Sequence, residues 1–249
     1  MNQNSARIML STREQIMLTL MALGFLIGLQ HALEADHIAA VSVIARNTAS
    51  RTMAIVQGCA WGFGHTLALL ALVTIVMRSG FSISNNMSHW MEFGVGIMLI
   101  FLGLRAISTA QKRRVHVHFH RHDDDRVHMH AHSHTPKAPT DHDQGHAVHL
   151  SRKTALPLFV GLVHGVAGSA ALVILLTAMS LSTLWQVIGY VLAFGAGSIL
   201  GMASMMLVFS VPVSWAQKKS AWGEFAFSMA IGLAVVGVGV LRCLSSAMA

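Results

Sequence analysis

Charged residues are scarce in this sequence, which has 249 residues of which 11% are Asp, Glu, Lys or Arg. Hydrophobic residues make up 54% of the chain and occur in long blocks instead of at amphipathic spacing. A soluble protein this small would have to bury several consecutive blocks in its core, so the composition argues against a soluble domain. The chain has only 2 cysteines, Cys59 and Cys243, and both lie inside apolar blocks, so we interpret them as packed thiols and not as a disulfide.

Several functional motifs are also missing. The sequence has no Gly-Lys-Ser/Thr loop for binding phosphate, which argues against ATP hydrolysis by that route. It has no adjacent pair of histidines, the arrangement expected of a membrane di-iron oxidase or desaturase, and we predict that the protein is not an enzyme and has no cofactor. Residues 1–10 are polar, so no cleavable signal is expected. The net charge of +7 is confined to the ends and loops of apolar blocks, which argues against binding nucleic acid.

Six apolar blocks of about 20 residues or more are long enough to cross a hydrocarbon core of roughly 30 Å. They cover residues 16–45, 54–77, 91–110, 155–179, 184–211 and 223–244. We therefore predict an all-α integral membrane protein with six transmembrane helices. Its expected location is the cell membrane, in particular a bacterial inner membrane, with the lipid bilayer as its surroundings.

The basic residues indicate an orientation. Thirteen of the 17 Lys and Arg residues fall on the side of the membrane that holds segment 105–153. The four on the other side are Arg7, Arg13, Arg78 and Arg242. Because Lys and Arg near span ends are retained in the cytoplasm, we predict that both termini lie outside and that segment 105–153 lies inside. If residues 16–45 formed two elements, such as a re-entrant hairpin, the amino terminus would move to the other side.

An internal repeat relates the two halves of the chain. Gly28-Leu-Gln-His31 recurs as Gly161-Leu-Val-His164, and in the same register Gly62-Phe-Gly-His65 aligns with Gly195-Ala-Gly-Ser198. Two weaker matches follow in the same order, Trp90 with Trp222 and Arg105 with Arg242. Because each unit has three spans, the second copy must enter the membrane from the opposite face. Inverted repeats are typical of secondary transporters, whose substrate sites lie near the membrane midplane; chance similarity among Gly-rich apolar segments is the alternative.

The repeat divides the chain into three parts. Residues 1–110 form the first three-span repeat, residues 111–153 a loop rich in histidine, and residues 154–249 the second repeat. The copies differ where the first has Asp36 and His37, because the second has Ser169 and Ala170 there. We therefore expect an asymmetric site on a symmetric scaffold.

The first span contains His31-Ala-Leu-Glu-Ala-Asp36-His37, which places ionisable side chains where lipid is expected. Such a residue costs about 2.5 to 3.5 kcal/mol at the centre of a bilayer, so its presence suggests a function. Imidazole nitrogen binds Ni, Co, Zn and Cu, and a carboxylate supplies compensating charge. We predict a divalent-metal site of His31, Asp36 and His37, completed by His65 and His164 from other spans. A hydrogen bond between helices is the alternative for a lone histidine in a span.

The geometry of a straight helix does not suit this site. His31, Asp36 and His37 would point about 0°, 140° and 240° around an ideal helix, and residues 16–45 would form a helix roughly 45 Å long. Both facts predict a break or turn between Gly28 and Asp36, surrounded by protein or a water-filled cavity. Glu34 could be a ligand, a proton acceptor or a residue that orients an imidazole, or it could face the headgroups.

The loop between the repeats carries eleven of the 16 histidines. They alternate with other residues in 116–122 and again in 128–134, so those in an extended segment would share a face. Histidine-rich tracts are typical of metal binding, and nearby aspartates add oxygen ligands. We predict that this cytoplasmic loop is disordered without metal and serves as a low-selectivity reservoir or sensor, with a simple linker as the alternative.

The histidine, four residues, aspartate and histidine of His31, Asp36 and His37, followed by Gly64-His65, resemble the signature of the nickel/cobalt transporter family. That resemblance implies that these residues select and carry the metal. The second half, with Gly161-Leu-Val-His164, is similar to the shorter UreH-like proteins of the same superfamily, and the histidine-rich loop is similar to nickel/cobalt efflux proteins. The resemblance covers most of the chain and leaves the direction of transport open.

The function we predict is transport of Ni²⁺, or secondly Co²⁺, as a substrate and not as a cofactor. One alternative is a membrane accessory protein or sensor for maturation of a nickel enzyme such as urease or hydrogenase, which would need only the loop. The less favoured alternative is a membrane di-iron oxidase. Both uptake and efflux are compatible with these residues.

Overall fold

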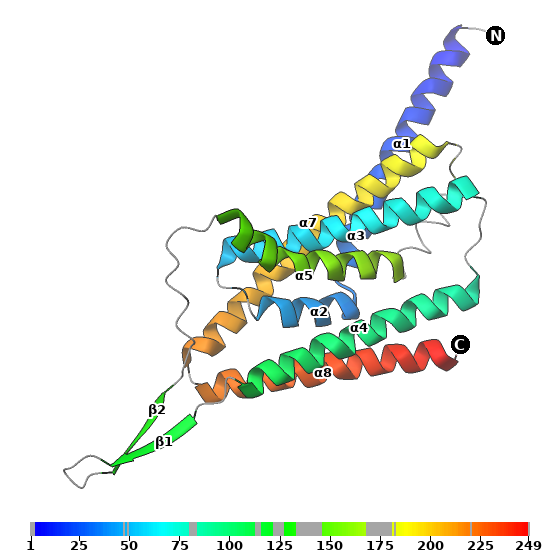
Figure 1. The fold of residues 1–249 in the computed structure, drawn as a ribbon. Coiled ribbons are helices and arrows are strands. Elements are labelled where there is room, and N and C mark those ends of the chain that lie inside the picture. Colours follow the sequence, from blue (N-terminus) through cyan, green and yellow to red (C-terminus); the bar gives the residue numbers. More distant parts are fainter. Residues whose placement is uncertain are drawn as a thin grey trace.

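The computed structural model describes residues 3–46, 48, 50–79, 84–112, 116–121, 127–132, 146–167, 181, 183–219 and 221–248. Most of these residues are helical (Figure 1). The helices are α1 (Gln3–His31), α2 (Ala35–Ala45), α3 (Arg51–Ser79), α4 (Asn85–Lys112), α5 (His146–Ala167), α7 (Leu184–Lys219) and α8 (Ala221–Met248). Two short strands, β1 (His116–Arg121) and β2 (Val127–His132), lie between α4 and α5.

Four of these helices, α3, α4, α7 and α8, are long and apolar enough to cross a membrane. Helices α1 and α2 pass the same test together as a bent pair, which makes five candidate spans if the pair is one broken span and not a re-entrant loop. The predicted span at 155–179 is described only to residue 167, where Lys153–Val166 forms a shorter apolar helix. The prediction of an all-α membrane protein is therefore confirmed at this coarser level.

The break predicted in the first span is present. Helices α1 and α2 meet at an angle of 59°. Three backbone bonds turn the chain, from the N–H of Ala32 to the carbonyl of Gly28 (3.4 Å), from that of Leu33 to Gln30 (2.9 Å) and from that of Glu34 to His31 (3.1 Å). Glu34 is extended, with φ −65° and ψ 150°, and its carbonyl then accepts the N–H of Ile38 (2.9 Å) to start α2.

Glycines allow the long helices to pack closely. Gly58 and Gly62 of α3 face Ala203 and Ile199 of α7, so these helices are antiparallel. Close approach of this kind, through small residues, is characteristic of helix packing in membranes. A Cβ added at Gly62 would lie 2.6 Å from the Cα of Ile199, which leaves no room for a larger residue.

The other helix pairs follow the same principle. Helices α4 and α8 are also antiparallel, since Gly96 contacts Gly239 and Gly103 contacts Gly232. Helix α1 instead runs parallel to α7, with Gly24 at Tyr190 and Gly28 at Phe194. Helix α3 runs parallel to α5, with Gly161 at Trp61 and Gly165 at His65. Both termini lie at one end of this bundle and the strands at the other (Figure 1).

The short helix α2 lies at the centre of the bundle (Figure 1), and most of its residues are buried. Its residues Ala39 to Ala45 pack in the main apolar cluster with Trp61, Leu99 and Met202. Its carboxyl end is fixed by Arg46, whose Nη1 donates to the carbonyl of Ala106 on α4 (2.9 Å). A buried, irregular segment inside a membrane bundle is tolerated because the surrounding helices exclude lipid from it.

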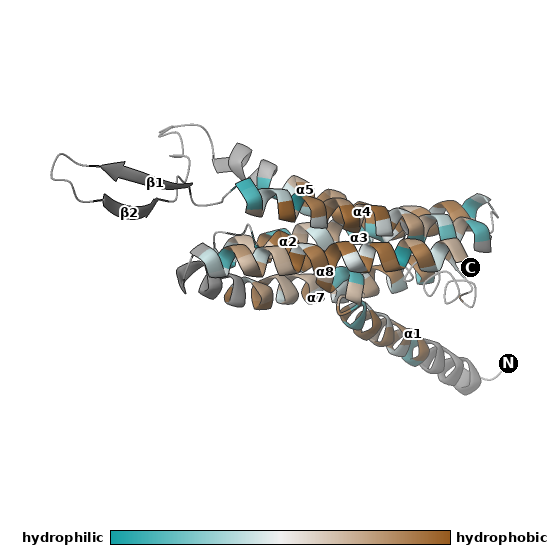
Figure 2. Cartoon of the chain, turned by 90° about the horizontal axis from the view of Figure 1, so that it is seen from below, coloured by the Kyte–Doolittle hydropathy of each residue, from teal (hydrophilic) through white to brown (hydrophobic). Residues whose placement is uncertain are grey.

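The outer surface of the bundle is apolar as well. Figure 2 shows hydrophobic residues along most of the described length of α3, α4 and α8, with hydrophilic residues mainly near the helix ends. Large apolar side chains such as Phe63, Phe101 and Leu233 are more than half exposed. Exposed apolar surface on this scale fits contact with lipid and not with water.

The two strands pair antiparallel in the histidine-rich segment. The register sets His116 opposite His132, His118 opposite His130 and His120 opposite His128. Residues directly opposite each other in an antiparallel pair point to the same face of the sheet. The histidines of both strands therefore lie on one face of the hairpin, and the residues between them lie on the other. Disorder of this loop without metal, expected from its low apolar content and its prolines, stays a prediction. The pairing itself was not foreseen, because local alternation does not reveal which tracts pair with each other.

Candidate metal site

The break between α1 and α2 brings the candidate ligands of the first span together. His31 is the last residue of α1, and Asp36 and His37 are in the first turn of α2. All three are buried, His31 and Asp36 at 4% exposure and His37 at 0%. The change of direction at residues 32–34 overcomes the divergence that these side chains would have on a straight helix.

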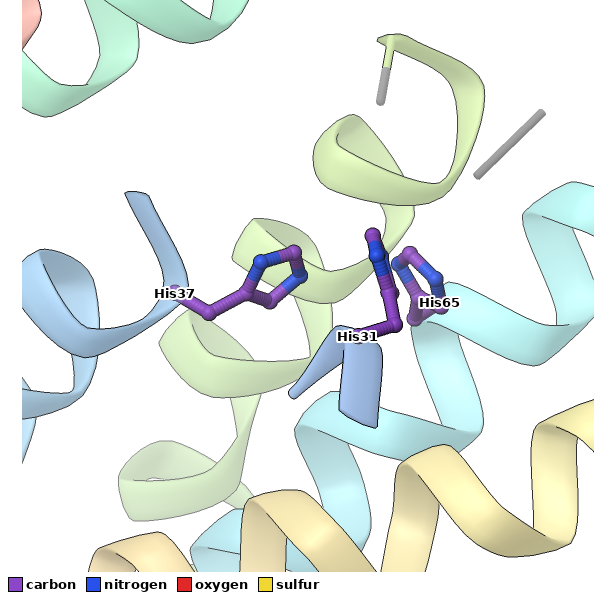
Figure 3. A group of neighbouring side chains, drawn as sticks. All are labelled: His31, His37 and His65. Carbon is purple, nitrogen blue, oxygen red and sulfur yellow. The ribbon is translucent and has the colours of Figure 1, made fainter. Parts of the chain in front are cut away.

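Two further histidines come from other helices, as the sequence predicts. His65 of α3 and His164 of α5 are both fully buried. The ring of His65 lies 5.1 Å from that of His31 and 5.7 Å from that of His37, measured between ring centres, and the rings of His37 and His164 are 4.5 Å apart. Figure 3 shows His37 pointing from α2 toward the side-by-side rings of His31 and His65.

These side chains form two overlapping groups that could each hold a metal ion. The first is His31, His37 and His65, and the second is Asp36, His37 and His164. Within each group the nitrogen or oxygen atoms lie within 4.8 Å of one another. His37 belongs to both groups, so the two candidate positions are adjacent.

Carboxylates orient two of the imidazoles. Glu34 Oε1 lies 2.7 Å from Nδ1 of His31, and Asp36 Oδ1 lies 3.0 Å from Nδ1 of His37. Asp36 Oδ1 also accepts the backbone N–H of His37 at 2.8 Å. Metal-binding histidines commonly use one ring nitrogen for the metal and the other for a carboxylate. Of the roles considered for Glu34, its position matches that of a residue that orients an imidazole.

Several ring nitrogens of His31, His37 and His65 are buried without a partner among the described residues. Nε2 of His31, Nε2 of His37 and both ring nitrogens of His65 have no hydrogen bond in the part of the chain that the structure describes. A buried polar atom without a partner costs about 1 to 3 kcal/mol, so several at one point need an explanation. A divalent ion that binds imidazole nitrogen supplies one.

Two residues of the site were missed from the sequence. Nη2 of Arg242 lies 3.2 Å from Oδ2 of Asp36, although the sequence suggested only a topological role for this arginine. The ring of Trp61 lies 6.0 Å from that of His37 and 5.8 Å from that of His164. The position of Arg242 inside the last apolar block was a usable signal, because a charged residue in a span usually has a partner there. No sequence signal distinguishes Trp61 from an ordinary core residue.

A buried set of imidazoles and a carboxylate inside an apolar helical bundle is the arrangement expected of a protein that carries metal ions across a membrane. The family described as NicO, high-affinity nickel-transport protein, matches residues 17–247, and the chain belongs to this family. It is also 34% identical over 207 residues to urease accessory protein UreH of Bacillus sp. (strain TB-90), covering 82% of this chain and 81% of that protein. No solved structure matches the chain.

The family confirms the class of function predicted from the sequence. The protein is a membrane transporter of nickel or cobalt, and the metal is its substrate and not a cofactor. Because the family is one of transporters, the protein is not an enzyme and the di-iron oxidase alternative is set aside.

Proposed function

We propose that Ni²⁺, and secondly Co²⁺, crosses the membrane through a single site near the midplane. Its ligands are His31, Asp36, His37, His65 and His164. The observation that carries this proposal is the convergence of unpartnered, buried imidazole nitrogens of His31, His37 and His65. The ion exchanges water for these ligands, the two halves of the protein move relative to each other, and the ion leaves on the opposite side.

The two halves are inverted three-span repeats with six spans in total. Packing supports this. The register that aligns His31 with His164 also aligns Gly28 with Gly161 and Trp61 with Phe194. In the structure Gly28 contacts Phe194 and Gly161 contacts Trp61, so the two contacts correspond. A second such pair of contacts is Gly197 with Phe25 and Gly64 with Leu158. A two-fold axis that exchanges the halves accounts for both correspondences.

The helix directions also support inversion. Helices α3 and α7 are antiparallel, as are α4 and α8. Helix α1 runs with α7 and α5 runs with α3, so α1 and α5 are opposed too. In the third helix of each half, Gly232 corresponds to Gly96 and Gly239 to Gly103, in a register slightly shifted from that of the earlier helices.

Both termini lie outside and the histidine-rich hairpin lies in the cytoplasm, in the inner membrane of a bacterium. The positions of the termini and the strands at opposite ends of the bundle support this topology, together with the distribution of Lys and Arg. The hairpin then meets metal on the cytoplasmic side, as a reservoir or sensor. The bundle itself carries the translocation site.

The flux of ⁶³Ni through cells tests this function. We expect His37→Ala to abolish flux, because His37 belongs to both ligand groups, whereas deletion of residues 115–150 changes only the rate or the metal threshold. His89→Ala is the matched control, since His89 lies on α4 outside either ligand group. Normal flux in His37→Ala would contradict the assignment of His37 to the transport site. Loss of flux only on deletion of the loop would favour a sensor.

The sign of the same flux gives the direction. Uptake of a dication gains about 4.6 kcal/mol per 100 mV from the membrane potential, twice the value for a single charge. Efflux works against the same energy and needs a coupled proton. Dissipating the potential therefore slows uptake, whereas efflux fails when the proton gradient is removed.

A link to nickel-enzyme maturation is a further part of the proposal. The UreH relative is named as a urease accessory protein, and its similarity spans most of both chains. Supplying nickel to maturation of urease or hydrogenase would explain such a role without an enzymatic activity. Urease activity at limiting nickel, measured in a host with and without this chain, tests the link, with His37→Ala as the inactive control.

A further inference from the structure

The two oxygens of Asp36 have different partners. Oδ1 binds the backbone N–H and Nδ1 of His37, at 2.8 and 3.0 Å. Oδ2 faces Nη2 of Arg242 at 3.2 Å and Nε2 of His164 at 4.0 Å. The only oxygen of Asp36 that remains for a metal ion is thus the one that the guanidinium occupies.

We propose that Arg242 is a tethered cation that competes with the metal for Asp36 and sets how tightly the site holds its substrate. This inference rests on the proposed function of the site. With Arg242 in place, the positive guanidinium balances the negative carboxylate in the empty site. A dication bound to Oδ2 would lie next to the guanidinium, and the repulsion between two cations in a buried site is strong. The metal and Arg242 therefore occupy Oδ2 in turn.

The side chain of Arg242 can move out of the site and back while its helix stays in place. Its side chain is 32% exposed, whereas that of Asp36 is 5% exposed, so the guanidinium reaches into the site from the surface of the bundle. The backbone around it is fixed to α4, where Gly239 contacts Gly96 and Sγ of Cys243 lies 3.7 Å from the carbonyl of Phe93. The movement is then one of a long, flexible side chain.

The ion pair also connects the two halves of the protein. Asp36 is on α2 of the first half and Arg242 is on α8 of the second. Metal binding at Oδ2 breaks this link, and release of the metal restores it. Occupancy of the site is thereby coupled to contact between the halves, which is what alternating access requires.

Equilibrium binding of Ni²⁺ to the purified full chain tests the competition. We expect Arg242→Gln to lower the apparent Kd by roughly tenfold, about 1.4 kcal/mol, and to slow ⁶³Ni flux because the expelling cation is gone. Arg242→Lys keeps a cation and should lie between this variant and wild type. In an Asp36→Asn background, Arg242→Gln should leave the Kd unchanged. Arg105→Gln, at the corresponding position of the first half in the sequence repeat, is the control and should match wild type.

An unchanged or raised Kd in Arg242→Gln overturns the proposal. If the ion pair only supported the structure of the site, breaking it would weaken the binding of Ni²⁺. A measurement on the wild type is independent of how the variants fold. Phenylglyoxal modifies free arginine, and we expect Ni²⁺ to increase its rate of reaction at Arg242 and to leave the rate at Arg105 unchanged, both read by mass spectrometry. Equal rates at Arg242 with and without Ni²⁺ also overturn the proposal. Failure of the proposed function is distinct, since wild type and His37→Ala would then bind Ni²⁺ equally.

Discussion

Gly28→Ala is a test of how the helix packing positions the metal ligands. Gly28 lies one turn before His31 on α1 and faces the backbone of Phe194 on α7. Its carbonyl also accepts the hydroxyl of Ser198 at 3.2 Å. The substitution adds a single methyl group to a helix, where alanine is favoured over glycine, so any loss must come from packing between the helices.

The size of the effect follows from the contact distances. The new Cβ would lie 2.8 Å from the carbonyl carbon of Phe194, whereas carbon atoms pack at about 3.5 to 4.0 Å. The two helices must therefore separate by roughly 1 Å, and overpacking of this kind costs about 1 to 3 kcal/mol. A functional constellation tolerates displacements of about 0.5 Å, so His31 should move out of reach of the shared ion.

We expect Gly28→Ala to bind Ni²⁺ roughly tenfold more weakly, or about 1.4 kcal/mol, and to lower the melting temperature of the protein in detergent. Binding is measured by titration and melting by fluorescence-detected size exclusion. Gly94→Ala and Gly237→Ala are the controls, because nothing lies within 4 Å of a Cβ at either position. If Gly28→Ala binds and melts like these controls, the packing of α1 on α7 does not position His31.

Three other substitutions test further parts of the structure. Gly161→Ala should repeat the effect through His164, because its Cβ would lie 2.9 Å from the carbonyl carbon of Trp61; a Kd like that of Gly94→Ala would contradict this. Glu34→Gln should raise the Kd for Ni²⁺ by about 10- to 100-fold through loss of the carboxylate at His31, whereas Glu92→Gln, outside the ligand groups, should not. Cys59→Ser with Cys243→Ser should transport like wild type with or without reductant, since both thiols are free; a reductant-sensitive flux in wild type argues against this.

The candidate ligands could be picked out from the sequence because an ionisable side chain in an apolar span is costly and therefore rare. His31, Asp36, His37, His65 and His164 stand out in apolar blocks, and the structure buries all five together. The break before Asp36 followed from the helical angles and from the length of a straight helix over residues 16–45, since no straight helix aims these residues at one ion. Helical geometry and the cost of burying an ionisable side chain can both be worked out from a single sequence.

Contacts between distant segments were harder to predict. The pairing of Arg242 with Asp36 joins residues 206 positions apart, and hydropathy places the arginine near a membrane surface. The register of the hairpin depends in the same way on two tracts that meet only in space. Both cases show that charge and periodicity identify which residues need a partner, whereas the fold decides which partner they receive.

The proposed repeat offers a physical reason for the asymmetry of the site. In the register of the repeat His31 corresponds to His164, but His65 corresponds to Ser198, which is fully buried and bonds the carbonyl of Gly28. In the second half this position thus bonds the backbone of α1, whereas in the first half it carries the candidate ligand His65. Arg242 pairs with Asp36 in the structure, so the alternation proposed above gives this carboxylate a cationic partner both before and after the metal binds, and the site can take up the ion and let it go.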